Sequence, residues 1–272
     1  MSDEGDRLDG HLMAADETEG LERYLRVIYD CRLGCGGRGF VLVPDERGAH
    51  MEDCECRKRA VLLYRLDQAN VGERFIDFDA AKLDPAFVAL NHVEINAIWD
   101  FIHRLPNRIE AGHGLYLSGP NGVAKTALTA LIVRQACMLG LPAYQATLSN
   151  LVKLRLDGMR DPAAREKSEW ISSAAVKVLA IEEVDKLEIL SATAGGSLRH
   201  DAISEIMNNV YYRKRTLVVT ANVPLLGPGG LEDRSRFPDF PTHIIDRMKS
   251  LSPLSLNGES FRIRERWVPG TP

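Results

Sequence analysis

The sequence contains no apolar run of the roughly 20 residues that a membrane-spanning helix requires, and it has little excess of either charge. Its formal net charge is -4. Residues 1–20 carry seven acidic side chains and one basic one, which leaves the rest of the chain slightly basic. Such an acidic start is unlike a secretory signal or a mitochondrial presequence. We therefore expect a disordered tail over residues 1–20, a cytoplasmic location and no membrane partner.

Cysteine is scarce, and four of the five cysteines fall within one short stretch: Cys31, Cys35, Cys54 and Cys56. In a reducing cytosol such a cluster indicates a metal site rather than disulfides. Zinc takes four sulfur or nitrogen ligands, often as two close pairs. We expect these four thiolates to bind Zn²⁺, with His50 as a possible substitute and four buried free cysteines as the alternative. Cys137 lies in an apolar helical segment and is expected to pack in the core.

From residue 113 onward, short apolar segments typical of strands alternate with helical segments. The expected strands are 113–119, 142–148, 175–183 and 216–222, and the expected helices are 125–139, 149–159 and 200–214. Ser149 or Asn150 is the expected cap of the second of these helices. The alternation predicts an α/β domain with a parallel sheet and crossover helices.

The first part of the chain is expected to be an appendage to this domain. Helices are predicted over residues 21–30 and 57–71, on either side of the cysteine-rich stretch, and over 87–105, ended by Pro106. We divide the chain into the tail, a zinc-binding N-terminal module at 21–70, a linker at 71–90 and a nucleotide-binding domain at 91–272.

The segment GPNGVAKT, residues 119–126, lies between an expected strand and an expected helix and departs by one residue from the pattern G-x-x-x-x-G-K-[ST]. Its members are Gly119, Pro120, Asn121, Gly122, Val123, Ala124, Lys125 and Thr126. Backbone N–H groups of such a loop bind phosphate oxygens, the lysine reaches the β- and γ-phosphates, and the Thr hydroxyl binds Mg²⁺. The segment therefore predicts an ATP site, with a chance glycine-rich turn as the alternative.

Ala124 replaces the second glycine of the pattern. We expect it in the first turn of the helix, where right-handed dihedrals suit a residue with a Cβ.

Polar side chains end two of the expected strands. Glu182 and Glu183 end the segment VLAIEE, and Asn222 ends TLVVTAN. Carboxyl ends of parallel strands meet at one edge of the sheet, so these residues are expected near the phosphate loop. Glu182 is expected to hold Mg²⁺, Glu183 to polarise the attacking water and Asn222 to orient that water or contact the γ-phosphate. The alternatives are solvated carboxylates and a simple turn residue.

These segments, together with CECRKR, ERFIDFD, IIDRMKS and GESFRIR, resemble an AAA+ ATPase of the DnaC/DnaI helicase-loader and IstB clade. The resemblance implies an AAA+ P-loop NTPase domain preceded by a small zinc-binding module. It also implies that Arg247 is an arginine finger for a neighbour's ATP, the alternative being a surface arginine paired with Asp246 or Glu265. An arginine expected ahead of Tyr211 is missing, and Arg213 or Arg215 is its candidate replacement.

The same resemblance implies an ATPase that acts as a helicase loader. Ala124 in the loop and Glu182, which stands where an aspartate is expected, could make this ATPase slow. Such a loader binds a replicative DnaB-type helicase and single-stranded DNA, and it assembles into a head-to-tail oligomer. Basic residues offered as DNA contacts are Lys153, Arg155, Arg160, Arg165 and Lys167. The alternatives are an IstB-like transposition helper that assembles on duplex DNA, and a scaffold that binds ATP without hydrolysing it.

Overall fold

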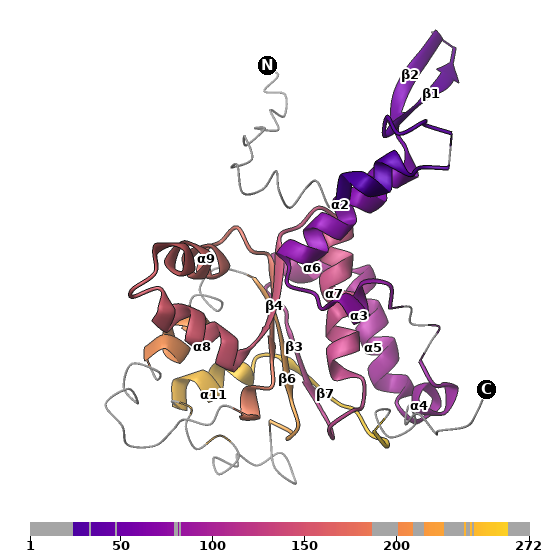
Figure 1. Cartoon of the computed structure of the whole chain (residues 1–272). Helices are drawn as coiled ribbons and strands as arrows, with labels where there is room; N and C mark the ends of the chain where they lie inside the picture. The colour runs from indigo at the N-terminus through magenta and orange to yellow at the C-terminus, as the bar shows by residue number, and fades with distance from the viewer. Residues whose placement is uncertain are drawn as a thin grey trace, which may run out of the picture. The chain divides into compact units, whose positions relative to one another are not determined.

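The structure is a computed structural model, and it describes residues 24–32, 34–46, 48–78, 81, 83–186, 201–208, 215–225, 237, 240 and 242–260 (Figure 1). The chain divides into two compact units, Met1–Arg65 and Leu66–Pro272. The expected tail at 1–20, Arg213, Tyr211 and Glu265 lie outside the described residues. Within the described part, every helix is too short or too polar to cross a bilayer.

The first unit combines helical segments with a β-hairpin. Residues 24–29 are helical, and Tyr24 packs edge-on against Tyr64 of α2 (Glu55–Gln68), with ring centroids 5.9 Å apart. Strand β1 (Phe40–Asp45) pairs antiparallel with β2 (Gly48–Asp53). The hairpin was missed in the sequence because its strands are almost entirely exposed and lack the clear apolar–polar alternation of a half-buried strand.

The second unit is built on a five-stranded parallel sheet, which confirms the predicted fold class. Its strands are β3 (Leu115–Ser118), β4 (Ala143–Thr147), β5 (Val178–Glu182), β6 (Thr216–Ala221) and β7 (Ser252–Ser255), in the spatial order β4-β5-β6-β3-β7. Strands β3, β5 and β6 are buried on both faces, as their continuous apolar sequences require.

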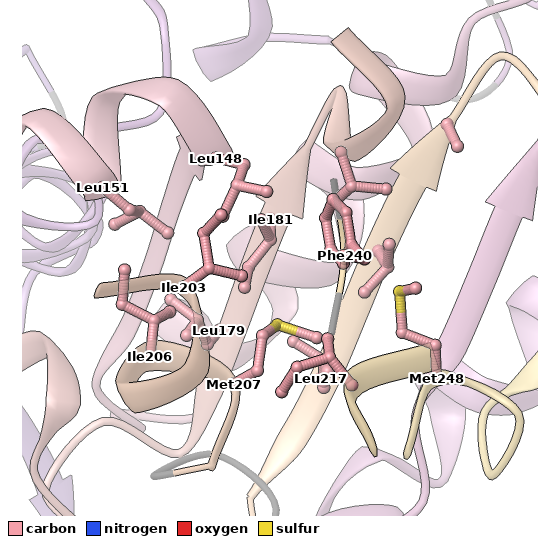
Figure 2. Packing of buried hydrophobic residues seen from close by; sticks show 14 of the residues in the cluster. Leu148, Leu151, Leu179, Ile181, Ile203, Ile206, Met207, Leu217, Phe240 and Met248 are labelled. Atoms are coloured by element: carbon pink, nitrogen blue, oxygen red, sulfur yellow. The ribbon is translucent and has the colours of Figure 1, made fainter. Parts of the chain in front are cut away.

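Helices cover both faces of this sheet. Figure 1 shows α5 (His92–His103) and α7 (Lys125–Met138) on one side, and α8 (Leu148–Asp157), α9 (Pro162–Ser172) and α11 (Thr242–Met248) on the other. Figure 2 shows the packing between the second group and the sheet. The side chains labelled there are Leu148, Leu151, Leu179, Ile181, Ile203, Ile206, Met207, Leu217, Phe240 and Met248.

Several helix boundaries differ from the expected ones. Residues 71–90, expected as an irregular linker, contain α3 (Glu73–Ile76) and α4 (Pro85–Leu90), and Asn91 separates α4 from α5. Pro106 lies in the first turn of α6 (Leu105–Glu110), where its missing N–H costs no helical hydrogen bond. The cap of α8 is Thr147, whose hydroxyl accepts from the Asn150 N–H, and not Ser149 or Asn150.

Candidate functional site

The phosphate loop connects the end of β3 to the start of α7. Residues that follow β7 pack against this loop. Gly119 and Gly122 have φ angles of 147° and 87°. A Cβ on Gly119 would clash with the Leu256 carbonyl oxygen, and one on Gly122 would clash with the Ser260 hydroxyl. Both positions therefore require glycine for backbone conformation and for space.

Ala124 does not have the conformation that the sequence predicted. It is the N-cap of α7 and lies in the left-handed region, with φ 60° and ψ 13°. That region disfavours a residue with a Cβ by about 1–2 kcal/mol. The alanine is therefore a strained substitute for the glycine of the usual pattern, and not a residue of the first right-handed turn.

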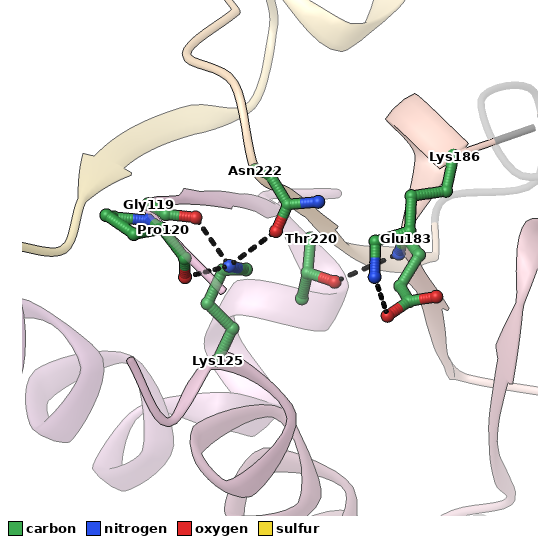
Figure 3. A network of polar contacts seen from close by, with 7 residues as sticks. All are labelled: Gly119, Pro120, Lys125, Glu183, Lys186, Thr220 and Asn222. Atoms are coloured by element: carbon green, nitrogen blue, oxygen red, sulfur yellow. Dashed lines mark hydrogen bonds and ion pairs between the residues drawn. The ribbon is translucent and has the colours of Figure 1, made fainter. Parts of the chain in front are cut away.

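The Lys125 ammonium is folded back onto its own loop (Figure 3). It donates to the carbonyl oxygens of Gly119 at 2.5 Å and Pro120 at 2.8 Å, and to Asn222 Oδ1 at 3.1 Å. The last contact joins two residues 97 positions apart, because β3 and β6 are neighbours whose carboxyl ends meet at this edge.

A cavity of about 390 Å³ opens beside the loop, within the usual size range of small-molecule sites. Polar and phosphate-loop residues line it: Asn121, Gly122, Ala124, Lys125, Thr126, Glu183, Thr220 and Asn222. A second group of lining residues comes from earlier in the chain: Arg74, Phe75, Phe78, Leu83 and Asp84. A phosphate-binding loop with a cation, together with aromatic side chains in the same cavity, fits the two parts of a nucleotide.

The second group of lining residues had no role assigned from the sequence. It comes from the segment ERFIDF and the start of α4, where Arg74 stacks over the Phe75 ring at 4.5 Å. Only the family resemblance of ERFIDFD pointed to this segment, because neither its periodicity nor its spacing marks a binding site.

Glu182 ends β5 and is 9% exposed. Burial raises the pKa of its carboxyl, and the neighbouring Thr126 and Gln145 side chains partly oppose this shift. Its Oε1 has no hydrogen-bond partner among the described residues. An unpaired buried carboxylate oxygen beside the Thr126 hydroxyl fits the oxygen ligands that Mg²⁺ prefers, so these two residues are suited to hold that ion.

Glu183 lines the cavity in a strained backbone conformation, with φ 55°. Its N–H donates to Thr220 Oγ1 at 3.2 Å, and its carboxylate forms an ion pair of 2.6 Å with Lys186 in the following 3₁₀ turn, η2 (Val184–Lys186) (Figure 3). Left-handed conformations at residues other than glycine concentrate at functional sites. Thr220 was not identified from the sequence, because it looks like an ordinary strand residue.

Of the remaining predicted site residues, Val123 is buried and Arg247 does not line the cavity. Arg247 lies near the end of α11 and is half-buried, while the carboxylate of Asp246 pairs with Lys249 at 2.8 Å. Arg215 is 3% exposed, and its guanidinium donates to the Ile171 and Ser172 carbonyls at the end of α9. Arg215 therefore stabilises its own chain and cannot replace an arginine that reaches a neighbour.

The basic residues offered as DNA contacts are largely engaged within the chain. Lys153 pairs with Asp157 at 2.9 Å, and Arg155 with Glu205 at 2.7 Å. Arg165 donates to the Gly158 carbonyl at 3.0 Å. A solvated, internally paired surface accounts for these contacts.

The four N-terminal cysteines converge, and their sulfur atoms all lie within 4.8 Å of one another. The Cys31–Cys54 and Cys35–Cys56 sulfur pairs are 3.8 Å and 3.5 Å apart. A tetrahedral site with zinc–sulfur bonds of about 2.3 Å requires sulfur separations of about 3.8 Å. The donor set and its spacing therefore fit zinc.

The protein shifts the pKa values of two of these thiols in opposite directions. Burial acts to raise the pKa of Cys35, but the Gly39 backbone N–H and the neighbouring thiols lower it to about 6. Burial raises the pKa of Cys56. His50 is not part of the group: in β2 it contacts Asp45 at 3.1 Å and Glu52 at 2.8 Å. The sequence-based alternative of a histidine ligand is therefore wrong. Cys137 is buried in α7, as predicted.

Comparison with known proteins agrees with the architecture. Residues 115–239 match the ATPase family associated with various cellular activities, AAA. No curated protein matches the chain.

Solved structures extend the likeness beyond the matched residues. A protein from Streptococcus pyogenes serotype M3, described as a primosome component, is similar with a TM-score of 0.55 at 16% identity, over 74% of this chain and 97% of that one. The DnaC helicase loader is similar with a TM-score of 0.50 at 20% identity, over 68% of this chain and 100% of that one. At these identities the likeness establishes the fold. The chain thus carries an AAA domain, preceded by a small unit with a four-cysteine group suited to zinc.

Proposed function

We propose that the chain is an ATP-dependent helicase loader that binds a replicative DnaB-type helicase and single-stranded DNA during replication initiation. The observation that carries the proposal is the convergence of Lys125, Glu183 and Asn222 around one cavity at the carboxyl edge of the sheet. The fold likeness to a helicase loader over that protein's whole length supports the class, as does the resemblance of the sequence motifs.

ATP is expected to lie with its phosphates along residues 119–126 and its base against the cavity residues Arg74, Phe75 and Phe78. Mg²⁺, held by Thr126 and Glu182, would neutralise charge on the phosphates. Lys125 would exchange the loop carbonyls for phosphate oxygens, Glu183 would accept a proton from the attacking water, and Asn222 would orient that water. Release of Glu183 from Lys186 frees its carboxylate for this step.

Arg247 is proposed to act on the ATP of a neighbouring copy. It lies outside the cavity of its own chain, and an arginine offered in trans requires a head-to-tail interface. The cysteine-containing unit is proposed to bind the helicase, with zinc supplying folding energy to a segment that has a small core of its own.

A loading assay tests this function directly. A replicative helicase from the same host is mixed with a closed circle of single-stranded DNA, which a hexameric ring can enter only when opened. The loader is expected to raise the amount of helicase on the circle in the presence of ATP, and Lys125→Ala is expected to abolish the gain. Equal helicase occupancy with and without the protein would exclude a loader.

A further inference from the structure

Gln145 is a buried polar residue for which neither the sequence motifs nor the phosphate loop provides a role. It is the third residue of β4, one of the two edge strands of the sheet, and is only 4% exposed. Its Oε1 has no hydrogen-bond partner among the described residues. Burying such an oxygen without a partner costs about 1–3 kcal/mol, so its retention in the core needs a reason.

The strand register places Gln145 next to Glu182, the residue proposed to hold Mg²⁺. Along the parallel β4–β5 pair, Gln145 lies opposite Ala180, and Thr147 lies opposite Glu182. Side chains two apart on a strand share a face, so Gln145 and Glu182 are diagonal neighbours on one face. Ala180, opposite Gln145 and two residues before Glu182, carries only a methyl group on that face.

The Gln145 backbone is fixed from the other side. Its N–H donates to the Ala69 carbonyl at 2.9 Å, and its carbonyl accepts from Asn70 Nδ2 at 2.7 Å. Thr147, the residue directly opposite Glu182, uses its hydroxyl to cap α8. Of these two β4 side chains, Gln145 is therefore the one left to hold the carboxylate.

We propose that Gln145 is a positioning residue for the magnesium site, holding the extended Glu182 carboxylate beside Thr126. Two buried oxygens, Gln145 Oε1 and Glu182 Oε1, lack partners on the same face of adjacent strands, where a hydrated cation supplies what both need. The inference rests on the proposed use of Mg·ATP.

This pairing also accounts for the glutamate at a position where an aspartate is usual. Glu182 has one methylene more than aspartate, which gives its carboxylate extra freedom. A buried amide on the neighbouring strand restricts that freedom and returns the carboxylate to one position. Partners of this kind, which orient a ligand without binding the metal, are typically worth 10- to 100-fold in metal affinity.

The test measures binding of Mn²⁺, a paramagnetic substitute for Mg²⁺, to the full chain with ADP, by electron paramagnetic resonance of the free ion. Gln145→Leu keeps the side-chain size and removes the amide. It is expected to weaken Mn²⁺ binding about 10-fold or more, while ADP affinity in EDTA stays within about twofold of wild type. Its thermal stability should be unchanged or higher, because the unpaired buried oxygen is gone.

Unchanged Mn²⁺ affinity in Gln145→Leu would overturn the inference. A parallel loss of ADP affinity in EDTA and of thermal stability would also overturn it, by showing that the residue only supports the fold. Gln145→Asn, which keeps the amide on a shorter arm, provides a second variant if the leucine protein does not fold, and it too should weaken Mn²⁺ binding.

The coupling between the two side chains is tested in a Glu182→Gln background. There Gln145→Leu should have no further effect on Mn²⁺ affinity, whereas an additive loss contradicts the proposal. Neither helicase nor DNA is present, so a failed loading assay leaves this result intact. Conversely, wild-type Mn²⁺ affinity in the Gln145 variants would leave the loader proposal standing.

Discussion

Lys125 Nζ lies 3.1 Å from Asn222 Oδ1, across two neighbouring parallel strands. The contact shows that the lysine of the phosphate loop and the polar residue after β6 occupy one site. In this arrangement the loop carbonyls and the Asn222 amide hold the ammonium that a phosphate would otherwise engage. Each of the two residues can therefore be tested for a separate role in binding and in hydrolysis.

Lys125→Ala is expected to weaken ATP binding by about 100-fold, because a hydrogen-bonded ion pair with a phosphate is worth about 1.5–3 kcal/mol. Binding is measured with a fluorescent ATP analogue. Lys177→Ala is a matched control: its ammonium bonds the Ala174 carbonyl just before β5, at the opposite end of that strand. The control should bind ATP normally. Undiminished ATP binding by Lys125→Ala would show that residues 119–126 do not form the nucleotide site.

Asn222→Ala is expected to behave differently. Loss of one oriented polar group at a reacting centre typically costs about 10²–10³ in turnover. ATP affinity should change only a few-fold, because Asn222 is proposed to contact only the γ-phosphate end of the nucleotide and the attacking water. A coupled assay of phosphate release, set beside the binding measurement, separates the two effects. Equal losses of binding and turnover would mean that Asn222 supports the loop and takes no part in hydrolysis.

Ala124→Gly should stabilise the protein. The left-handed conformation of Ala124 costs about 1–2 kcal/mol that glycine does not pay, offset in part by the extra backbone freedom of glycine in the unfolded chain. Ala130→Gly, in the interior of the same helix, should instead destabilise by about 1 kcal/mol or more. Urea unfolding of the two variants should therefore give shifts of opposite sign. Destabilisation by both changes would contradict the strained backbone.

Cys54→Ser should release zinc and unfold the Met1–Arg65 unit, because four ligands are needed to close the site. ATP binding, which belongs to the other unit, should persist. Cys137→Ala provides the control, since Cys137 is a core residue of α7 and no part of the cluster. Elemental analysis should find about one zinc per chain in the control and in wild type. Full zinc content in Cys54→Ser would remove that cysteine from the site.

The raised pKa of Glu182 predicts that the free energy of unfolding of the metal-free protein depends on pH. The folded state holds the Glu182 proton more tightly than the unfolded state, so this group favours folding at low pH. That contribution is lost as pH rises from the ordinary value near 4.5 through the higher folded pKa. Glu182→Gln should therefore be more stable than wild type at pH 8 in EDTA, by about 1–2 kcal/mol. The difference should shrink toward pH 4; a constant difference would place the cause elsewhere.

Sequence patterns predicted four of the five strands, β3 to β6, because each is a short, buried apolar run. They missed β7, whose four residues are mostly exposed and carry no apolar run. The phosphate loop, the two glutamates and Asn222 follow from the same logic, since carboxyl ends of parallel strands share an edge. The conformation of Ala124 was predicted wrongly, because the pattern of residue types does not reveal the sign of φ at a single loop position.

Contacts between segments far apart in the chain could also not be predicted from the sequence. Gln145 is one polar residue in an apolar strand, and its relation to Glu182 depends on the register of two strands 35 residues apart in the order of the chain. The cavity is lined both by Arg74, Phe75, Phe78, Leu83 and Asp84 and by a loop some 40 residues later. The hairpin of β1 and β2 carries too few buried side chains to leave a periodic signal.

Native mass spectrometry of the protein with its host's replicative helicase, in the presence of ATP, tests the central claim most directly. A defined complex of the helicase with several copies of this chain, each carrying one zinc and one nucleotide, is the predicted result. No complex with the helicase, and assembly of the chain on duplex DNA instead, would contradict the loader and favour a transposition helper.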